Sequence, residues 1–396
     1  MLERILAGVR VLDLTQNVAG PFCSQLLGDF GAEVLKVERP GSGDDSRSWR
    51  SPEAGSLSPH FIALNRNKRS ICIDIGSDAG SAVVRRLAGS CQVFLHSMKP
   101  GSAEARGLGY EDLAKSDPGL VYCAISAYGE EGPLAHLPGY DPVMQAFSGL
   151  MSLCGQPGDE PSRVPVSLVD VGTGMWAAIG ILGACLERSR TGRGMRVQAS
   201  LLETSLSWMN ALIVAHAISA KSPQRMGSAL ANAAPYELFR VSDGHVMVAA
   251  PNDRLFALVC DALGCETLVR DARFATNAVR LANRAELHRL LEERTSLQGM
   301  ASLVAALRNR GVPCGEMNGF GQALSHPQVQ AVGMTGPWSE DAGLPPLVET
   351  PLRMNGQRSH ARSAPRALGQ DTEAVLREAG WTDAEISALR EGGVLG

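Results

Sequence analysis

The residue best suited to covalent chemistry is a single acid, Asp170, in a stretch of small and apolar residues between Val164 and Gly194. A carboxylate that is ionised and partly removed from water can act as a nucleophile. A carboxylate in such a place can instead cap a helix by accepting hydrogen bonds from its first backbone N–H groups, and Thr173 can do the same. Local spacing fits a nucleophile and a cap equally well, so both interpretations stay open.

The residues after Asp170 predict how it is positioned. Gly172 and Gly174 indicate a tight turn that follows an extended segment, and the apolar run from Met175 to Leu186 predicts a buried helix. Basic residues near its end and glycines beyond are typical of a helix C-terminus. We therefore expect Asp170 near a helix N-terminus, where free N–H groups and the helix dipole favour an anion. The N–H groups near the two glycines are the expected oxyanion donors.

Other chemistries lack their sequence signatures. The eight histidines never pair four residues apart around an acid, and the nine cysteines form no C-x-x-C pair, so no metal site is predicted. The G-x-S-x-G elbow of a serine hydrolase does not occur. The turn after the first predicted strand lacks G-x-G-x-x-G, so a dinucleotide fingerprint is missing.

The composition is that of an ordinary globular enzyme. Of the 396 residues, 44% are hydrophobic and 20% are charged, the formal net charge is −4 and the isoelectric point is about 6.1. Scattered basic residues give no reason to expect a nucleic-acid partner. No signal-peptide pattern is seen, the longest apolar run is shorter than the roughly 20 residues that cross a bilayer, and the cysteines lie in apolar runs, as reduced thiols do. We therefore expect a cytoplasmic protein without a membrane partner.

The N-terminal part alternates between strand-like and helix-like segments. Strands are predicted at 9–14, 32–38, 70–75, 92–96 and 120–126, and helices at 23–30 and 79–88. Gly20 and Pro21 are expected in a turn, and 41–59 as a long surface loop. This alternation predicts an α/β domain with a Rossmann-like parallel sheet.

Later segments predict a second, smaller α+β domain. A helix is expected over 138–154, and the apolar face assigned to it comprises Val143, Ala146, Phe147, Leu150 and Met151. A strand at 197–201 and a long helix at 202–220 follow. Beyond them the sequence predicts a hairpin (236–240 and 246–250) and helices at 255–263, 284–295 and 300–310. We expect a large domain over 1–220, the small domain over 221–326, and a return over 327–396 that completes the large domain.

The return is expected to begin with a long extended segment, 327–363, which is polar and rich in proline and glycine. A helix pair is predicted after it, at 372–379 and 382–389, with Thr382 as an N-cap.

The stretch that holds Asp170, VSLVDVGTGMWAAIGILGACLERSRTGRG, resembles the nucleophile segment of the class III CoA-transferases, the carnitine and formyl-CoA transferase family. The resemblance continues in the same order along nearly the whole chain. It includes residues 9–47, 64–75, 126–152, 232–250, 311–318 and 367–386. The arrangement is closest to members that use succinyl-CoA and small dicarboxylates.

The resemblance implies a fold and an assembly. In this family the first and last thirds form a Rossmann-like large domain and the middle forms the small one. Two chains interlock like rings in a homodimer. The resemblance also implies an acyl-CoA thioester and a carboxylic acid as substrates, with no tightly bound cofactor.

The resemblance also assigns residues. Asp170 falls on the nucleophile, and the coenzyme-contacting motifs fall on Arg39, Ile73, Asp74, Ile75, Gly76, Ser97, Met98, Lys99, Gly139, Tyr140 and Asp141. From the local sequence alone, Arg39 is equally well explained as a solvent-exposed charge, and Tyr140 as a ring packed on the core. The usual arginine of one phosphate contact falls at Ala105, with Arg106 one place on.

The resemblance implies CoA transfer from an acyl-CoA donor to a free acid through an aspartyl anhydride and thioester, with succinate or glutarate as the expected kind of substrate. Formyl-CoA and oxalate are not favoured, because Val18 stands where formyl-CoA transferases keep a glutamine and residues 232–236 replace their glycine run. A 2-methylacyl-CoA racemase on the same fold is the first alternative, although Tyr140 occupies the place of its histidine base. A non-catalytic CoA-binding protein is the second.

Overall fold

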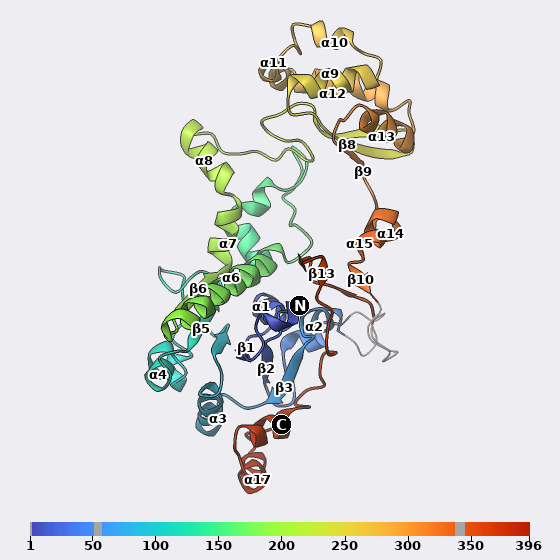
Figure 1. The fold of residues 1–396 in the computed structure, drawn as a ribbon. Coiled ribbons are helices and arrows are strands. Elements are labelled where there is room, and N and C mark those ends of the chain that lie inside the picture. Colours follow the sequence, from blue (N-terminus) through green and yellow to red (C-terminus); the bar gives the residue numbers. More distant parts are fainter. Residues whose placement is uncertain (1, 51–57, 337–344) are drawn as a thin grey trace. The chain divides into compact units, whose positions relative to one another are not determined.

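The chain separates into two units in this computed structural model, which describes residues 2–50, 58–336 and 345–396 (Figure 1). The first unit comprises Met1–Met151, Arg163–Lys221 and Gly333–Gly396. The second comprises Ser152–Ser162 and Ser222–Val332. The domain ranges expected from the sequence stay a prediction.

A six-stranded parallel sheet forms the centre of the first unit (Figure 1). Its strands are β1 (Arg10–Leu14), β2 (Glu33–Glu38), β3 (Lys68–Cys72), β4 (Val93–His96), β5 (Val121–Ser126) and β6 (Arg196–Ser200). They lie in the order β3-β2-β1-β4-β5-β6, and all five pairings are parallel. The predicted α/β fold with a parallel sheet is confirmed, and the strand order reverses between β1 and β4.

Helices pack on both faces of this sheet, as is usual for a parallel sheet. Those of the first unit are α1 (Ala19–Asp29), α2 (Pro59–Leu64), α3 (Asp78–Ala88), α4 (Tyr110–Ser116), α5 (Asp141–Phe147), α6 (Leu168–Thr191), α7 (Leu201–Trp208), α8 (Asn210–Ser219), α16 (Thr372–Glu378) and α17 (Asp383–Glu391). One core layer joins the sheet to α1 and α6. The other joins it to α3, α4, α16 and α17.

Two helices begin earlier than the sequence indicates. Helix α6 begins at Leu168, so the expected tight turn at Gly172 and Gly174 is part of the helix. Glycine lowers helix propensity by only about 1 kcal/mol, which tertiary packing outweighs here. Helix α1 begins at Ala19, so the Gly20-Pro21 turn is also wrong; proline is tolerated in a first turn, where its missing N–H would have no helical partner.

The face predicted for residues 138–154 is also wrong. Helix α5 ends at Phe147 and buries Asp141, Met144 and Gln145, whereas Val143 is exposed. The apolar spacing misses this face because Asp141 and Gln145 hydrogen-bond each other (2.6 Å), which makes their burial tolerable.

Two further expectations need correction. The single helix over 202–220 is divided at Met209 into α7 and α8, which are bent by 63°. Helix α8 is apolar on most sides, so its spacing gives no signal for the bend. The surface loop expected over 41–59 contains a short 3-10 helix, η2 (Asp45–Ser48), and buries Asp44 and Ser46 in polar contacts; residues 51–57 of that loop lie outside the described part.

The second unit has its own antiparallel sheet and core. Its strands are β7 (Tyr236–Val241), β8 (Gly244–Ala249) and β9 (Cys314–Glu316). Its helices are α9 (Asp253–Ala262), α10 (Thr267–Arg270), α11 (Asn277–Ala282), α12 (Arg284–Thr295), α13 (Met300–Asn309), α14 (Phe320–Ser325) and α15 (Pro327–Val332). The predicted hairpin and the three main helices, α9, α12 and α13, are present.

The last part of the chain returns to the first unit. Its short strands are β10 (Thr335–Gly336), β11 (Leu347–Val348), β12 (Arg353–Met354) and β13 (Gln357–Arg358). The start of the expected extended segment is helical (α15), and its residues 337–344 lie outside the described part. The predicted helix pair is confirmed, and Thr382 forms a capping box with Glu385 at the start of α17.

Helix α6 is longer than the apolar run suggested. Its 24 residues are long and apolar enough to cross a membrane, and α7 with α8 passes the same test as a bent pair. Buried residues of α6 such as Val169, Ala177 and Ile181 belong to the core against the sheet, as in the central helix of a globular domain.

Candidate functional site

A cavity of about 370 Å³ lies at the carboxyl edge of the parallel sheet, where the strand order reverses between β1 and β4. Its lining includes residues 16–20 after β1, 97–100 after β4, Ser126 and Ala127 at the end of β5, 137–140 before α5, and Asp170 in α6. Ligands of open α/β sheets bind at this switch point. The cavity is therefore the candidate site.

Asp170 lies in the first turn of α6, and the acid that caps this helix is another residue. The buried carboxylate of Asp141 accepts hydrogen bonds from the N–H groups of Val169 (2.7 Å) and Asp170 (3.3 Å). These are two of the N–H groups that a helix start leaves without helical partners. The side chain of Asp170 is thereby left free of a capping role and lines the cavity.

The protonation of Asp170 is unusual. Burial, and to a smaller extent the neighbouring Asp141 carboxylate, raise the pKa of Asp170 to about 7. Its carboxyl oxygens accept no hydrogen bond from any residue that the structure describes, which differs from the expectation of a carboxylate held by donors. The group is therefore basic and close to half-ionised at neutral pH.

The expected oxyanion donors at Gly172 and Gly174 lie inside α6, where they permit close packing. A Cβ on Gly174 would lie 2.4 Å from the carbonyl oxygen of Ala19, and one on Gly172 would lie 2.2 Å from the ring of Trp208. Both glycine N–H groups belong to the interior of a regular helix. Gly174 thus lets α6 touch the backbone of α1 beside the cavity.

Free N–H groups are found instead at the start of α1. Val18, Ala19 and Gly20 line the cavity, and their N–H groups donate to no acceptor in the described ranges. The start of α1 has no side-chain cap. Two helix N-termini, those of α1 and α6, therefore meet at this cavity, and both favour negative charge.

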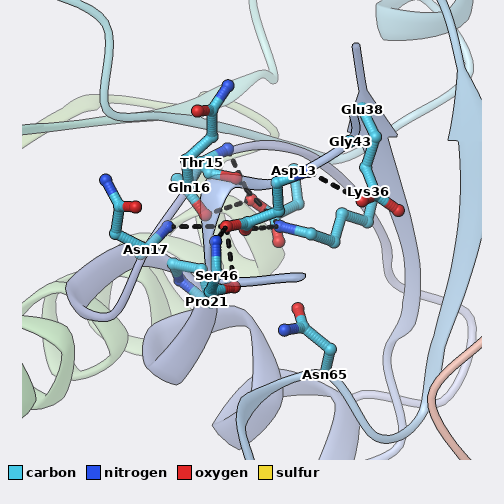
Figure 2. A network of polar contacts seen from close by, with 12 residues as sticks. Asp13, Thr15, Gln16, Asn17, Pro21, Lys36, Glu38, Gly43, Ser46 and Asn65 are labelled. Carbon is cyan, nitrogen blue, oxygen red and sulfur yellow. Dashed lines mark hydrogen bonds and ion pairs between the residues drawn. The ribbon is translucent and has the colours of Figure 1, made fainter. Parts of the chain in front are cut away.

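A buried ion pair holds the segment before α1 in place (Figure 2). Lys36 donates to the Asp44 carboxylate (2.8 Å) and to the carbonyl oxygen of Thr15 (2.9 Å). Asp44 in turn accepts from the N–H of Asn17 (3.1 Å) and of Ser46 (2.9 Å). Burial alone would raise the pKa of Asp44, but the Lys36 ammonium and the hydrogen bonds from Ser46 together hold that pKa below its usual value. The pair thus ties the cavity-lining segment at 16–20 to the segment that carries Asp45.

A second buried pair joins Lys68 and Asp13. Lys68 is 3.6 Å from Asp13 and donates to the Pro21 carbonyl oxygen (2.8 Å) and to Asn65 (2.9 Å). Lys68 is 2% exposed, and its hydrogen bond to Pro21 holds the first turn of α1. In Figure 2 the side chains of Gln16 and Asn17 extend away from Lys36.

Several residues predicted to bind the coenzyme lie in the cavity wall. They are Ile75, Ser97, Met98, Lys99, Gly139 and Tyr140. The ring of Tyr140 is 56% exposed, so it is not packed in the core and is available for stacking. Lys99 is the one cation among the described lining residues.

Other predicted residues are not in the described wall: Arg39, Ile73, Asp74, Gly76, Arg106 and Asp141. Arg39 forms an exposed ion pair with Asp45, which does line the cavity. Arg106 donates to the carbonyl oxygens of Ile75 (3.2 Å) and Ser102 (2.8 Å), so its guanidinium braces the chain behind the wall.

The polar groups of residues 73–76, which follow β3, form hydrogen bonds within the protein. Ile73 is buried and its N–H bonds to Glu38, while Asp74 accepts from the N–H of Gly76 (2.9 Å). Its assignment to the coenzyme stays a prediction, as do those of Arg39, Arg106 and Asp141.

Sequence reasoning did not single out several lining residues: Gln16, Asn17, Trp49 and Ser126. Their only signal is position, because Gln16 and Asn17 directly follow β1 and Ser126 ends β5. Asn17 also has a left-handed backbone (φ 69°), and its side-chain oxygen is buried without a hydrogen-bond partner in the described part of the chain.

Comparisons with known proteins agree on one family. The model of CoA-transferase family III matches residues 6–372. The chain is 37% identical over 374 residues to a succinyl-CoA:glutarate CoA-transferase of Mus musculus, covering 94% of this chain and 86% of that protein. It is 35% identical over 373 residues to an acetyl-CoA:oxalate CoA-transferase of Acetobacter aceti, covering 94% and 95%. The crystal structure of a CAIB/BAIF family protein from Brucella suis superposes with a TM-score of 0.83 and 37% identity, covering 94% and 99%.

Proposed function

The chain belongs to CoA-transferase family III and is an acyl-CoA:carboxylate CoA-transferase, and we propose that Asp170 is its nucleophile. Two carboxylates are found among the described lining residues, Asp170 and Asp45. Asp45 is exposed and paired with Arg39. The single observation that carries the proposal is the unpaired, half-buried carboxyl of Asp170 in this cavity, whose pKa is raised to about 7.

The proposed reaction has four acyl-transfer steps, and each step releases either CoA thiolate or a carboxylate. The Asp170 carboxylate attacks the donor thioester and expels CoA thiolate, which leaves a mixed anhydride. The thiolate attacks the aspartyl carbonyl, releases the donor acid and leaves an aspartyl-CoA thioester. The acceptor carboxylate then attacks this thioester, and the expelled thiolate finally takes the acyl group of the new anhydride and restores Asp170. A carboxylate suits this route because anhydride and thioester are both activated.

The N–H groups at the start of α1 are the proposed oxyanion donors. Those of Val18, Ala19 and Gly20 are unpaired in the described structure and line the same cavity as Asp170. Donors fixed in advance by a helix start can stabilise developing negative charge without rearranging. The buried Lys36–Asp44 pair supports this arrangement, because it anchors the residues that precede these N–H groups.

We further propose a short dicarboxylate, such as succinate or glutarate, as the transferred or accepting acid. The support is the substrate named for the mouse relative. The Acetobacter relative acts on oxalate, so a panel that includes oxalate, succinate and glutarate with their CoA esters tests this choice directly. Equal rates with monocarboxylates of the same length would contradict it.

Arg39 remains the proposed partner of a coenzyme phosphate. Its partner Asp45 is an exposed residue of the cavity lining, so a phosphate bound there could replace that carboxylate. Arg39→Ala is expected to weaken CoA binding by about 1.5–3 kcal/mol, the worth of one charge-assisted contact. Calorimetry with CoA measures this, and an unchanged affinity in a folded variant contradicts the assignment.

Substitution and trapping test the nucleophile. Asp170→Asn is expected to reduce turnover by several orders of magnitude, because it removes the whole covalent route. Incubation with a CoA donor followed by hydroxylamine should modify the peptide that holds Asp170. Asp45→Asn is the matched control, since it removes the other lining carboxylate and should leave that label in place. Full activity of Asp170→Asn would refute the proposal.

The assembly and location are also proposals. We propose a cytoplasmic homodimer of interlocked chains that binds its CoA thioester as a substrate, with no resident cofactor. Exposed apolar residues on α6 and α8 support a partner copy: Met175, Trp176, Ile179, Ile213, Val214 and Ile218.

A further inference from the structure

A second cavity, of about 200 Å³, adjoins the cavity that holds Asp170. We call it the side chamber. The two cavities share four lining residues and are therefore direct neighbours: Met98, Pro100, Ile125 and Ser126. The side chamber also lies at the carboxyl ends of β4 and β5, because His96 ends β4 and Ser126 ends β5.

His96 lines the side chamber with an unused donor. The residue is 5% exposed, and its ring packs edge-on against Tyr122, with 5.2 Å between the ring centroids. Its Nδ1 accepts a hydrogen bond from the N–H of Met98 (3.2 Å). Nε2 is buried and has no hydrogen-bond partner among the described residues.

The tautomer of His96 follows from these contacts. Burial lowers the pKa of His96 to about 4, so the ring is neutral at pH 7. Because Nδ1 is an acceptor, the single ring proton is on Nε2. A buried N–H without an acceptor is unfavourable, because it has lost its hydrogen bond to water. Such a donor indicates that something with an acceptor oxygen occupies the chamber during function.

The charges around the side chamber decide what kind of acceptor fits. Glu104 and Glu130 line it, and none of the described lining residues is a cation. Glu130 pairs with Arg196, whereas Glu104 makes no ion pair with any described residue. A phosphate or carboxylate would be repelled there. A neutral carbonyl group with apolar neighbours is favoured, since Met98, Pro100 and Ile125 supply apolar surface.

We propose that the side chamber binds a carbonyl group of the pantetheine arm of the acyl-CoA substrate, with His96 Nε2–H as the donor. The two ends of a dicarboxyl-CoA ester are anionic, and the arm between them is neutral and carries two amides. The chamber adjoins the cavity in which the thioester must reach Asp170, so the inference rests on the proposed function in that one respect. His96 is thereby a binding residue for the arm.

Two substitutions separate the two ring nitrogens. His96→Asn keeps a side-chain acceptor near the Nδ1 position for the Met98 N–H and removes the Nε2 donor. His96→Gln places an amide donor near the Nε2 position and gives up the Nδ1 acceptor. Calorimetry with CoA and with pantetheine should show about fivefold weaker binding for the Asn variant, the worth of one neutral hydrogen bond, and near wild-type binding for the Gln variant.

Steady-state kinetics should agree, with KM for the CoA ester raised in His96→Asn and kcat little changed, because the arm contact is made equally in the ground and transition states. Adenosine 3′,5′-bisphosphate lacks the arm and should bind all three proteins equally.

Two results would overturn the inference. Wild-type affinity for CoA and pantetheine in both variants means that the chamber holds only water. Equal weakening in both variants, with a matching loss of thermal stability, means that His96 acts only through packing. Because equilibrium binding of free CoA needs no turnover, these outcomes are independent of whether Asp170 is the nucleophile.

Discussion

At the scale of single residues, Asp141 influences Asp170 in two ways. Its carboxylate accepts hydrogen bonds from two N–H groups at the start of α6. Its negative charge adds to the effect of burial in raising the pKa of Asp170. A carboxylate with a higher pKa is a better nucleophile once it is ionised. The resemblance assigns Asp141 to the coenzyme, which stays a prediction, and the contacts seen in the structure serve the helix that carries Asp170.

The rate should therefore depend on pH near neutrality. Only ionised Asp170 can attack, so kcat/KM is expected to rise with pH through an apparent pKa of about 7. Asp141→Asn keeps an acceptor for the helix start and removes the charge, so it should move this rise to lower pH. Rate profiles of both proteins from pH 5 to 9 measure the shift. Superimposable profiles would show that the Asp141 charge has no effect on the pKa of Asp170.

Stability gives an independent test of the same pKa. The folded protein holds a proton on Asp170 that the unfolded chain loses near its ordinary value of 3.8, so unfolding free energy falls as pH rises from about 4 to about 7. Asp170→Asn is neutral throughout and escapes this loss. The variant should gain stability over wild type, on the order of 1–3 kcal/mol at pH 8 and close to none at pH 4. Denaturant unfolding at the two pH values measures it, and a pH-independent difference would contradict the raised pKa.

At the scale of elements, the site depends on the contact between the starts of α1 and α6. Gly174 allows this contact, since any Cβ there would meet the Ala19 carbonyl oxygen. The free N–H groups of α1 and the carboxyl of Asp170 line one cavity because these helices approach so closely. A separation of the two helices would move the donors away from the acid.

Gly174→Ala should therefore reduce both stability and activity. Overpacking against backbone costs about 1–3 kcal/mol, which exceeds the gain of up to about 1 kcal/mol in helix propensity. Gly183→Ala is the matched control in the same helix, because nothing lies within 4 Å of its Cβ. The control should be as stable as wild type or slightly more so, with full activity. Equal melting temperatures and equal turnover in the two variants would show that the contact between α1 and α6 can accommodate a methyl group at residue 174.

The sequence predicted the elements well where local pattern determines them. The five predicted strands of the N-terminal part, the hairpin of the second unit and the cap at Thr382 follow from alternation, turn residues and the capping box. The start of α6 was missed because its cap, Asp141, is 29 residues away from Asp170 and no local rule connects them.

Contacts between residues far apart in the sequence also explain which parts of the site could not be predicted. Lys36 and Asp44 come from a strand and from a loop that looked exposed, and only the fold makes them a buried pair. The side chamber depends on His96 and Glu104, which no motif joins. Asp170 could be singled out from the sequence because its segment resembles the nucleophile segment of the family, and its role stays a proposal.

At the scale of the whole molecule, the first unit leaves large apolar side chains uncovered. Trp176 and Ile179 of α6 are 47% and 55% exposed, and Ile218 of α8 is 83% exposed. Isolated apolar residues are normal on a surface, but several together on two helices are typical of a surface that binds a protein partner. A second copy of this chain is the proposed partner.

The homodimer is expected to persist on dilution and to exchange no subunits. Interlocked chains can separate only by unfolding, so a mixture of tagged and untagged dimers should remain unmixed under native conditions and give hybrids only after denaturation and refolding. Sedimentation over a wide range of concentrations should show one dimeric species.

Ile218→Asp tests whether the exposed face of α8 lies in the interface. A buried charge without a partner should lower the yield of folded dimer. Leu297→Asp is the control, because Leu297 is similarly exposed (80%) and lies in the second unit. Rapid formation of hybrids would leave a dimer but remove the interlock, and a stable, active monomer would remove both.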